Sequence, residues 1–153
     1  MHISAKTDYA MRAMLVLADA PDGTWVKAEV ISEQQHLPRK FLEAILSDLR
    51  RARLVESLRG ADGGYRLAKP ASKIFVADVM RAVDGPLAEV RGLRPETLEY
   101  EGSAARLQDV WVAVRSGLRA VLERISVADV SAGKMPAAVR SMIRDEEGWV
   151  PRI

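Results

Sequence analysis

Positively charged side chains are concentrated in one part of the sequence, residues 38–73. This segment holds nine basic residues against four acidic ones, a net charge of +5, whereas the whole chain of 153 residues carries only +2. Clustered arginine and lysine side chains can neutralise the phosphates of a nucleic acid. A solvated basic helix face would give the same count, so charge alone leaves both interpretations open.

Three side chains in or beside this basic segment have the chemistry to read bases. Phe41 can contact a thymine methyl group, and Glu43 can accept a hydrogen bond from a cytosine amino group. An acid within a basic face repels phosphate, which favours base reading, but a helical ion pair of Glu43 with Lys40 is an equal alternative. Arg59 can enter a minor groove from a hairpin tip, or can simply be an exposed turn residue.

Other basic residues suit contacts with the phosphate backbone, which add affinity and salt dependence without sequence preference. The predicted backbone contacts are Lys6, Arg39, Lys40, Arg50, Arg51 and Arg66.

The sequence offers little for catalysis or metal binding. It contains no cysteine and only two histidines, His2 and His36, which excludes thiolate chemistry and cysteine-held iron–sulfur clusters and makes a zinc site unexpected. Residues 60–64 are rich in glycine but precede no helix, so they do not form a phosphate-binding loop. We therefore expect no enzyme, no metal and no cofactor.

The basic segment is expected to lie on a helix-turn-helix. Apolar spacing predicts helices near residues 6–20, 28–35 and 38–53, and Pro38 suits the first turn of the third. The side chains predicted to face the core are Val30 and Ile31 in the second helix, and Leu42, Ile45, Leu46 and Leu49 in the third.

Beyond Arg53 the apolar period changes from that of a helix to that of a strand. Residues 54–58 and 64–67 read as two strands joined by a glycine-rich turn. Two helices with a tight turn, followed by a hairpin, define a winged helix-turn-helix, whose second helix enters the DNA major groove. With a further helix at 76–83, residues 1–86 are predicted to form a DNA-binding domain. The fold class is mainly α with a small β-hairpin wing.

The clearest amphipathic pattern lies at residues 103–125, after a connecting loop at 87–102. A helix of that length is roughly 34 Å long and must bury its apolar stripe. The same helix of a second chain is the simplest partner, and packing within the chain is the alternative. The predicted dimer interface is Leu107, Val110, Trp111, Val114, Leu118, Val121, Leu122 and Ile125.

The remaining segments complete the expected organisation. A short helix would end the dimerisation unit, residues 103–133, and the tail, residues 134–153, would cover the dimer helix or contact a partner. No apolar run is long enough for a membrane span or a secretory signal, so we expect a cytoplasmic protein.

The order of these motifs resembles that of the Rrf-type winged-helix transcriptional regulators of bacteria. The resemblance rests on residues 3–10, 31–33, 41–43, 49–50, 54–60, 63–67 and 82–86, and covers about residues 1–125. It implies a homodimer with crossed long helices, bound to a partly palindromic operator near a promoter and acting usually as a repressor. It also implies that Phe41, Glu43 and Arg59 occupy positions that read DNA.

The chain departs from that family in its sensing chemistry. Many members hold an iron–sulfur cluster through three cysteines in the loop that is here residues 90–105, and this loop has none. Asp8 matches an acidic position that helps to ligate the cluster in some members; here we expect a cap or an ion pair of the first helix. Gln108 lies near a ligand histidine of other members. Pro38 and Lys40 differ from the usual residues of the recognition helix, so the operator sequence is not predicted.

Two hypotheses follow for the function. The first is a cluster-free, sequence-specific regulator that binds double-stranded DNA as a homodimer, with a small-molecule or protein effector left open. The second is a ligand-sensing or protein-binding module whose wing is vestigial, with residues 90–102 and the apolar tail as its working surface.

Overall fold

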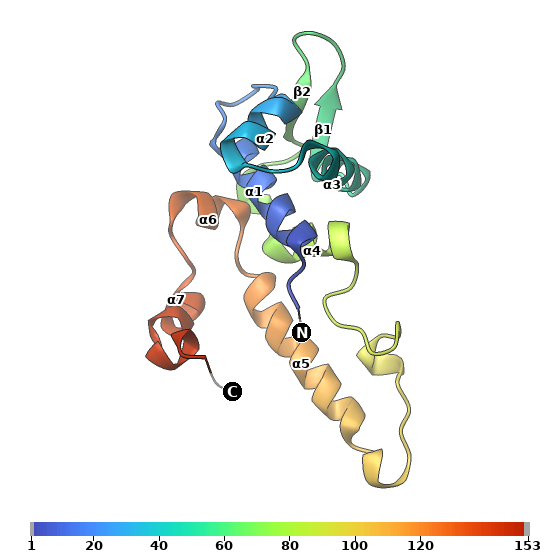
Figure 1. Ribbon diagram of the computed structural model, residues 1–153. Helices are drawn as coiled ribbons and strands as arrows, with labels where there is room; N and C mark the ends of the chain where they lie inside the picture. Colours follow the sequence, from blue (N-terminus) through green and yellow to red (C-terminus); the bar gives the residue numbers. More distant parts are fainter. Residues whose placement is uncertain (1, 152–153) are drawn as a thin grey trace.

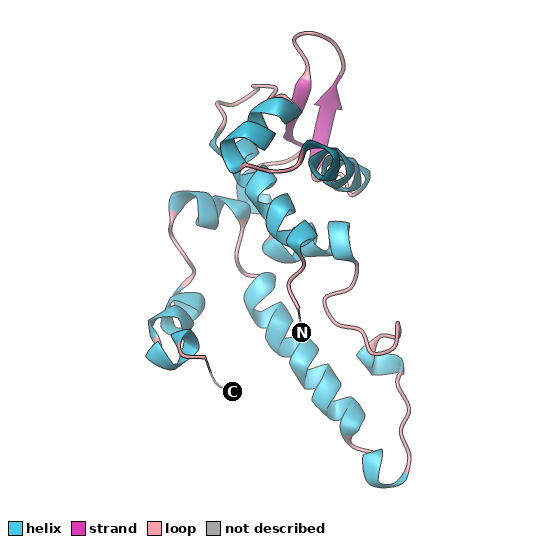
Figure 2. Ribbon diagram, in the orientation of Figure 1, coloured by secondary structure: helices cyan, strands magenta, loops and turns pink. Residues whose placement is uncertain are grey.

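The computed structural model describes residues 2–151, so residue 1 and residues 152–153 of the expected end segments lie outside the described part. Figure 1 shows the hairpin and the first four helices gathered at one end, with α5 (Leu107–Leu122) running away from them. The fold is mainly helical with one two-stranded sheet, as Figure 2 shows and as the sequence predicts.

The core of the N-terminal domain forms around α1 (Ala5–Asp19). This helix packs against α2 (Ala28–Gln35), α3 (Arg39–Arg51) and α4 (Val76–Asp84). The largest fully buried side chains of these four helices are Met14, Ile31, Leu42, Ile45, Leu46, Leu49 and Val79. The four buried positions predicted for α3 are all confirmed.

One core prediction in α2 is wrong. Ile31 is fully buried, but Val30, which was expected beside it, is exposed. Adjacent helical residues point about 100° apart, and this short helix buries only a narrow face. α2 ends at His36 in the left-handed conformation, and the Ser32 carbonyl accepts from the amide of Leu37, 3.0 Å away. Pro38 is the N-cap of α3 rather than part of its first turn.

The wing is the hairpin of β1 (Val55–Leu58) and β2 (Gly64–Leu67). Val26 pairs with its outer edge, since the amides of Val26 and Tyr65 each donate to the other's carbonyl at 2.8 and 2.7 Å. Gly64 lies at φ +150°, and a Cβ there would meet the Val26 carbonyl oxygen at 2.5 Å. The turn therefore needs glycine for close packing as well as for its backbone conformation.

The long helix is shorter than predicted. α5 has 16 residues, about 24 Å, and is preceded by a separate 3-10 turn at Gly102–Ala104. Ile125 lies beyond the helix, in extended chain whose carbonyl accepts from the amide of Val76 at 2.9 Å. It is buried within its own chain, so it does not share a helix face with the other predicted dimer residues.

After α5 the chain returns to the N-terminal domain. α6 (Val127–Ala132) packs on α1 and buries Val127 completely, so it completes the winged-helix core rather than extending the unit built on α5. Its start is fixed by Ser126, whose hydroxyl accepts from the Asp129 amide at 3.0 Å, while the Asp129 carboxylate accepts from the Ser126 amide at 2.8 Å. α7 (Ala137–Arg144) then packs against the 3-10 turn Glu146–Trp149.

The connecting loop is a packed element rather than a free linker. The 3-10 turn Pro95–Thr97 contacts α5, and Leu98 is 2% exposed. Gln108 donates to the Glu96 carbonyl at 3.1 Å, and the Trp111 indole donates to the Tyr100 hydroxyl at 3.2 Å. One side of α5 is thus covered by the loop. No helix within residues 2–151 is long and apolar enough to cross a membrane.

Candidate nucleic-acid interface

The N-terminal half of α3 presents a mixed apolar and charged face to solvent. Because Leu42 and Ile45 turn into the core, their neighbours Lys40, Phe41 and Glu43 are exposed. Phe41 is 66% exposed and lies beside a small apolar hollow that it shares with Tyr9. A phenyl ring kept in water gains little from burial on folding, so Phe41 is available to contact another molecule.

Glu43 has a partner, but not the one the helical spacing suggested. Its carboxylate accepts from the Arg39 guanidinium at 3.1 Å, while Lys40 makes no ion pair or hydrogen bond with another described side chain. Arg39 also pairs with Glu29 of α2. The hydrogen bond to Glu43 and the charge of Glu29 raise the pKa of Arg39. Arg39 therefore links α2 to α3, whereas the charge of Lys40 has no partner among the described side chains.

The two predicted wing arginines are in different situations. Arg59, beside the hairpin tip, is exposed and forms no ion pair or hydrogen bond with the rest of residues 2–151. Arg66 is half-buried: its guanidinium lies 4.1 Å from the centre of the Trp25 ring and pairs with Glu56 across the hairpin. Trp25 is not among the predicted contact residues, because its cation–π partner Arg66 is distant in the sequence and only the fold brings the two together.

The other predicted phosphate contacts are also engaged within the chain. The Lys6 ammonium lies 2.6 Å from an Asp48 carboxylate oxygen, and Arg51 pairs with the same residue at 3.0 Å. The hydrogen bond from Lys6, with the nearby positive charges, lowers the pKa of Asp48 against its partial burial. Arg50 donates to the Ser57 hydroxyl at 3.2 Å. These cations therefore make contacts within the domain in addition to giving its surface positive charge.

The recognition helix and the wing share one groove. Arg39 and Glu43 of α3 line a space of about 480 Å³ together with Glu29 and with Gly60, Gly63 and Gly64 of the hairpin turn. Phe41 does not line this groove but the neighbouring hollow, and Arg59 is outside both. The structure thus brings Glu43 and the hairpin turn to one groove, and it brings neither Phe41 nor Arg59 into that groove.

Comparison with known proteins matches this arrangement to one family. Residues 3–133 match the Rrf2 family, described as an iron-dependent transcriptional regulator. A Mycobacterium tuberculosis protein, whose name gives it provisionally as an HTH-type transcriptional regulator, is 47% identical over 95% of this chain and 90% of its own. The regulator CymR of Bacillus subtilis is 33% identical over 86% of this chain and 91% of its own.

Solved structures agree with this match. The structure of the B. subtilis global cysteine regulator CymR has a TM-score of 0.72 at 31% identity and covers 86% of this chain and 97% of its own. The structure of T. potens IscR has a TM-score of 0.66 at 30% identity and covers 100% of this chain and 94% of its own.

The iron chemistry in the family description does not fit this chain. The loop between α4 and α5 has no cysteine, and residues 2–151 place no group of three or more histidine, aspartate or glutamate side chains where they could hold a metal. Asp8 pairs instead with Arg12, 3.3 Å away on the same helix. Gln108 holds the loop through its side-chain amide.

The relatives are transcriptional regulators and not enzymes, and the helix-turn-helix with its wing is the part that binds DNA in such proteins. The chain therefore belongs to the Rrf2 family of transcriptional regulators.

Proposed function

We propose that this protein is a homodimeric repressor that binds a partly palindromic operator in the cytoplasm and needs no iron–sulfur cluster. One observation carries the proposal: α3 exposes Phe41 and Lys40, and the wing exposes Arg59, all without a partner among the described side chains. An exposed aromatic ring can contact a base, and exposed cations without partners can contact phosphates or enter a minor groove.

In this proposal α3 enters the major groove. Phe41 contacts a thymine methyl group, and Glu43 accepts from a cytosine amino group while Glu29 continues to hold Arg39. Arg59 enters the adjacent minor groove. The phosphate contacts are supplied by Lys40 and, where their internal pairs allow, by Lys6, Arg39, Arg50, Arg51 and Arg66.

The dimer forms along the side of α5 that the loop leaves open. No residue of α5 is buried within the chain, and Val110 and Val114 are 50% and 43% exposed. Leu107, Leu118 and Val121 fall on the same helix face, whereas Trp111 is turned toward the loop. Pairing two copies along this face buries the stripe and presents two copies of α3 to two half-sites.

Fluorescence anisotropy with a labelled duplex from the region upstream of the protein's own gene tests the proposal. We expect two chains per duplex, stronger competition by unlabelled operator than by a scrambled duplex, and a steep loss of affinity with salt. Equal competition by the two duplexes would contradict sequence-specific binding.

Transcription in vitro should fall as protein is added; a rise would make the protein an activator. Visible absorption by the active protein would contradict cluster independence.

A further inference from the structure

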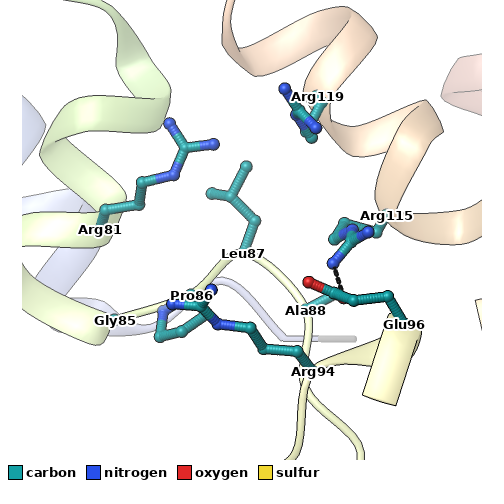
Figure 3. A pocket seen from close by; sticks show the side chains of 9 residues that line it. All are labelled: Arg81, Gly85, Pro86, Leu87, Ala88, Arg94, Glu96, Arg115 and Arg119. Atoms are coloured by element: carbon teal, nitrogen blue, oxygen red, sulfur yellow. Dashed lines mark hydrogen bonds and ion pairs between the residues drawn. The ribbon is translucent and has the colours of Figure 1, made fainter. Parts of the chain in front are cut away.

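Four arginine side chains from three segments converge on one pocket (Figure 3), and none of the residues that line it belongs to α3 or the hairpin. Arg81 comes from α4, Arg94 from the connecting loop, and Arg115 and Arg119 from successive turns of α5. The pocket has a volume of about 440 Å³. The Leu87 side chain points into the space between Arg81 and Arg119, so the lining is partly apolar.

The charges of this arginine pocket are only half balanced within the chain. Glu123 pairs with both Arg81 and Arg119, the latter at 3.0 Å, and Glu96 pairs with Arg115. The Arg94 guanidinium makes no hydrogen bond or ion pair with another side chain of residues 2–151, although its charge contributes to the lowered pKa of Glu96. Four guanidinium groups thus face two carboxylates.

The excess of two positive charges in the pocket indicates which kind of ligand it can bind. Guanidinium groups bind the oxygens of phosphates and carboxylates through paired hydrogen bonds, and a doubly charged group would offset the two uncompensated cations. The volume falls in the range of roughly 300–1,000 Å³ that holds small organic ligands, larger than a bare inorganic ion needs. Pro86, Leu87 and Ala88 offer an apolar surface for the rest of the molecule.

We infer that this pocket binds a small organic dianion, a phosphate monoester or a dicarboxylate, and that this ligand is the effector of the regulator. The regulatory part of the inference rests on the proposed function. The pocket joins α4 of the DNA-binding domain to α5, which carries the proposed dimer face. A ligand that bridges Arg81 and Arg94 to Arg115 and Arg119 fixes the angle between them, and with it the spacing of the two recognition helices.

Calorimetric titration of the full-length protein tests the site at constant ionic strength. The probes are glycerol 3-phosphate, succinate and inorganic phosphate, with chloride as the background anion. We expect one of the two organic dianions to bind once per chain and more tightly than inorganic phosphate. Stronger binding of glycerol 3-phosphate would identify a phosphate ester as the ligand class, and stronger binding of succinate a dicarboxylate. Failure of both to bind would overturn the proposal.

Matched variants separate the pocket from general surface charge. Arg94→Gln should weaken binding of the organic dianion at least tenfold, and Arg94→Lys should recover only part of it because the ammonium lacks the paired donors. Arg106→Gln removes the same charge from an exposed position before α5 that does not line the pocket, and should change binding less than twofold. Equal weakening by Arg94→Gln and Arg106→Gln would overturn the assignment of the site.

The effector role is measured through DNA binding. Adding the organic dianion that binds should change the operator affinity of the wild-type protein at least threefold and leave that of Arg94→Gln unchanged. Unchanged affinity in the wild type would remove the effector role while the binding site stands. If the protein binds no operator at all, the proposed function fails, but calorimetry still decides whether the pocket takes a dianion.

Discussion

The ammonium of Lys6 lies 2.6 Å from a carboxylate oxygen of Asp48, which ties the first turn of α1 to the recognition helix. The same ammonium donates to the Val83 carbonyl at 2.9 Å, at the end of α4. Asp84, the next residue, accepts from the hydroxyl of Thr7 at 2.7 Å. The start of α1 is therefore a junction of three helices, and the orientation of α3 depends on it.

Replacement of Asp48 by asparagine should lower the free energy of unfolding at pH 7 by about 1 kcal/mol, because Lys6 and Arg51 lose their common partner. The hydrogen bond from Lys6 holds the pKa of Asp48 below its ordinary value of 3.8. A depressed pKa gives stability that is present above the unfolded value and is lost as the pH falls through the folded one. Urea unfolding of the wild type and the variant should therefore differ at pH 7 and converge toward pH 3.

Asp62→Asn is the matched control, since this exposed wing residue has no hydrogen bond or ion pair to another described side chain. It should leave unfolding unchanged at both pH values. A constant difference between wild type and Asp48→Asn across this pH range would show that the carboxylate charge is not what stabilises the junction.

Local patterns predicted the recognition helix well and the end of α5 poorly. The stripe of Leu42, Ile45, Leu46 and Leu49 repeats at helical spacing and is buried as expected. Ile125 continues the helical spacing of α5 in the same way, yet it is buried in extended chain beside α4. For Ile125 the apolar periodicity indicated a buried side chain, but it could not show that a strand-like contact replaces the helix.

The charged residues show the same limit. Lys6 and Arg66 have the composition of phosphate contacts, but their partners Asp48 and Glu56 lie 42 and 10 positions away, and only the fold brings them together. The arginine pocket was missed for this reason. Its only local signal is the spacing of Arg115 and Arg119, which places both on one face of α5.

Replacement of Gly64 by alanine should destabilise the wing. The new Cβ would meet the Val26 carbonyl oxygen at 2.5 Å, in a backbone conformation that L-residues rarely adopt. We expect a loss of about 2 kcal/mol or more in thermal or urea unfolding. Gly148→Ala, where the nearest atom would be 3.5 Å away, should cost far less. Equal effects would contradict close packing of the wing against Val26.

Replacement of Glu43 by glutamine separates its two roles, base reading and the ion pair with Arg39. Loss of this exposed pair, 3.1 Å apart, should leave the free energy of unfolding nearly unchanged, because solvent screens exposed ion pairs. Base reading predicts a change of preference at one operator position in each half-site, because an amide pairs best with adenine and a carboxylate with cytosine. A selection from randomised duplexes measures it. An unchanged base preference would mean that Glu43 only pairs with Arg39 and reads no base. Glu33→Gln, at an exposed position of α2, is the control and should not change the base preference.

Lys40→Gln should weaken binding to operator and scrambled duplexes alike. Lys40 has no ion-pair partner among the described side chains, so its whole charge is available to a phosphate. Removing one such contact should reduce the slope of log affinity against log salt by about 1. Anisotropy titrations at several salt concentrations measure the slope. Lys134→Gln removes an equal charge between α6 and α7 and should leave it unchanged; equal slopes for the two variants would remove Lys40 from the interface.

Val114→Glu should dissociate the dimer. Val114 is 43% exposed in the single chain and lies in the middle of the open face of α5. In the dimer, the glutamate introduced there would be buried next to the same glutamate of the second copy, and the two negative charges would repel each other. Ser116→Glu places the same charge about 200° around the helix, where it would stay in water. Sedimentation should show a monomer for the first variant and a dimer for the second and for the wild type. Operator affinity should fall at least tenfold with Val114→Glu, because a monomer contacts only one half-site; a dimer that survives this substitution would move the interface away from α5.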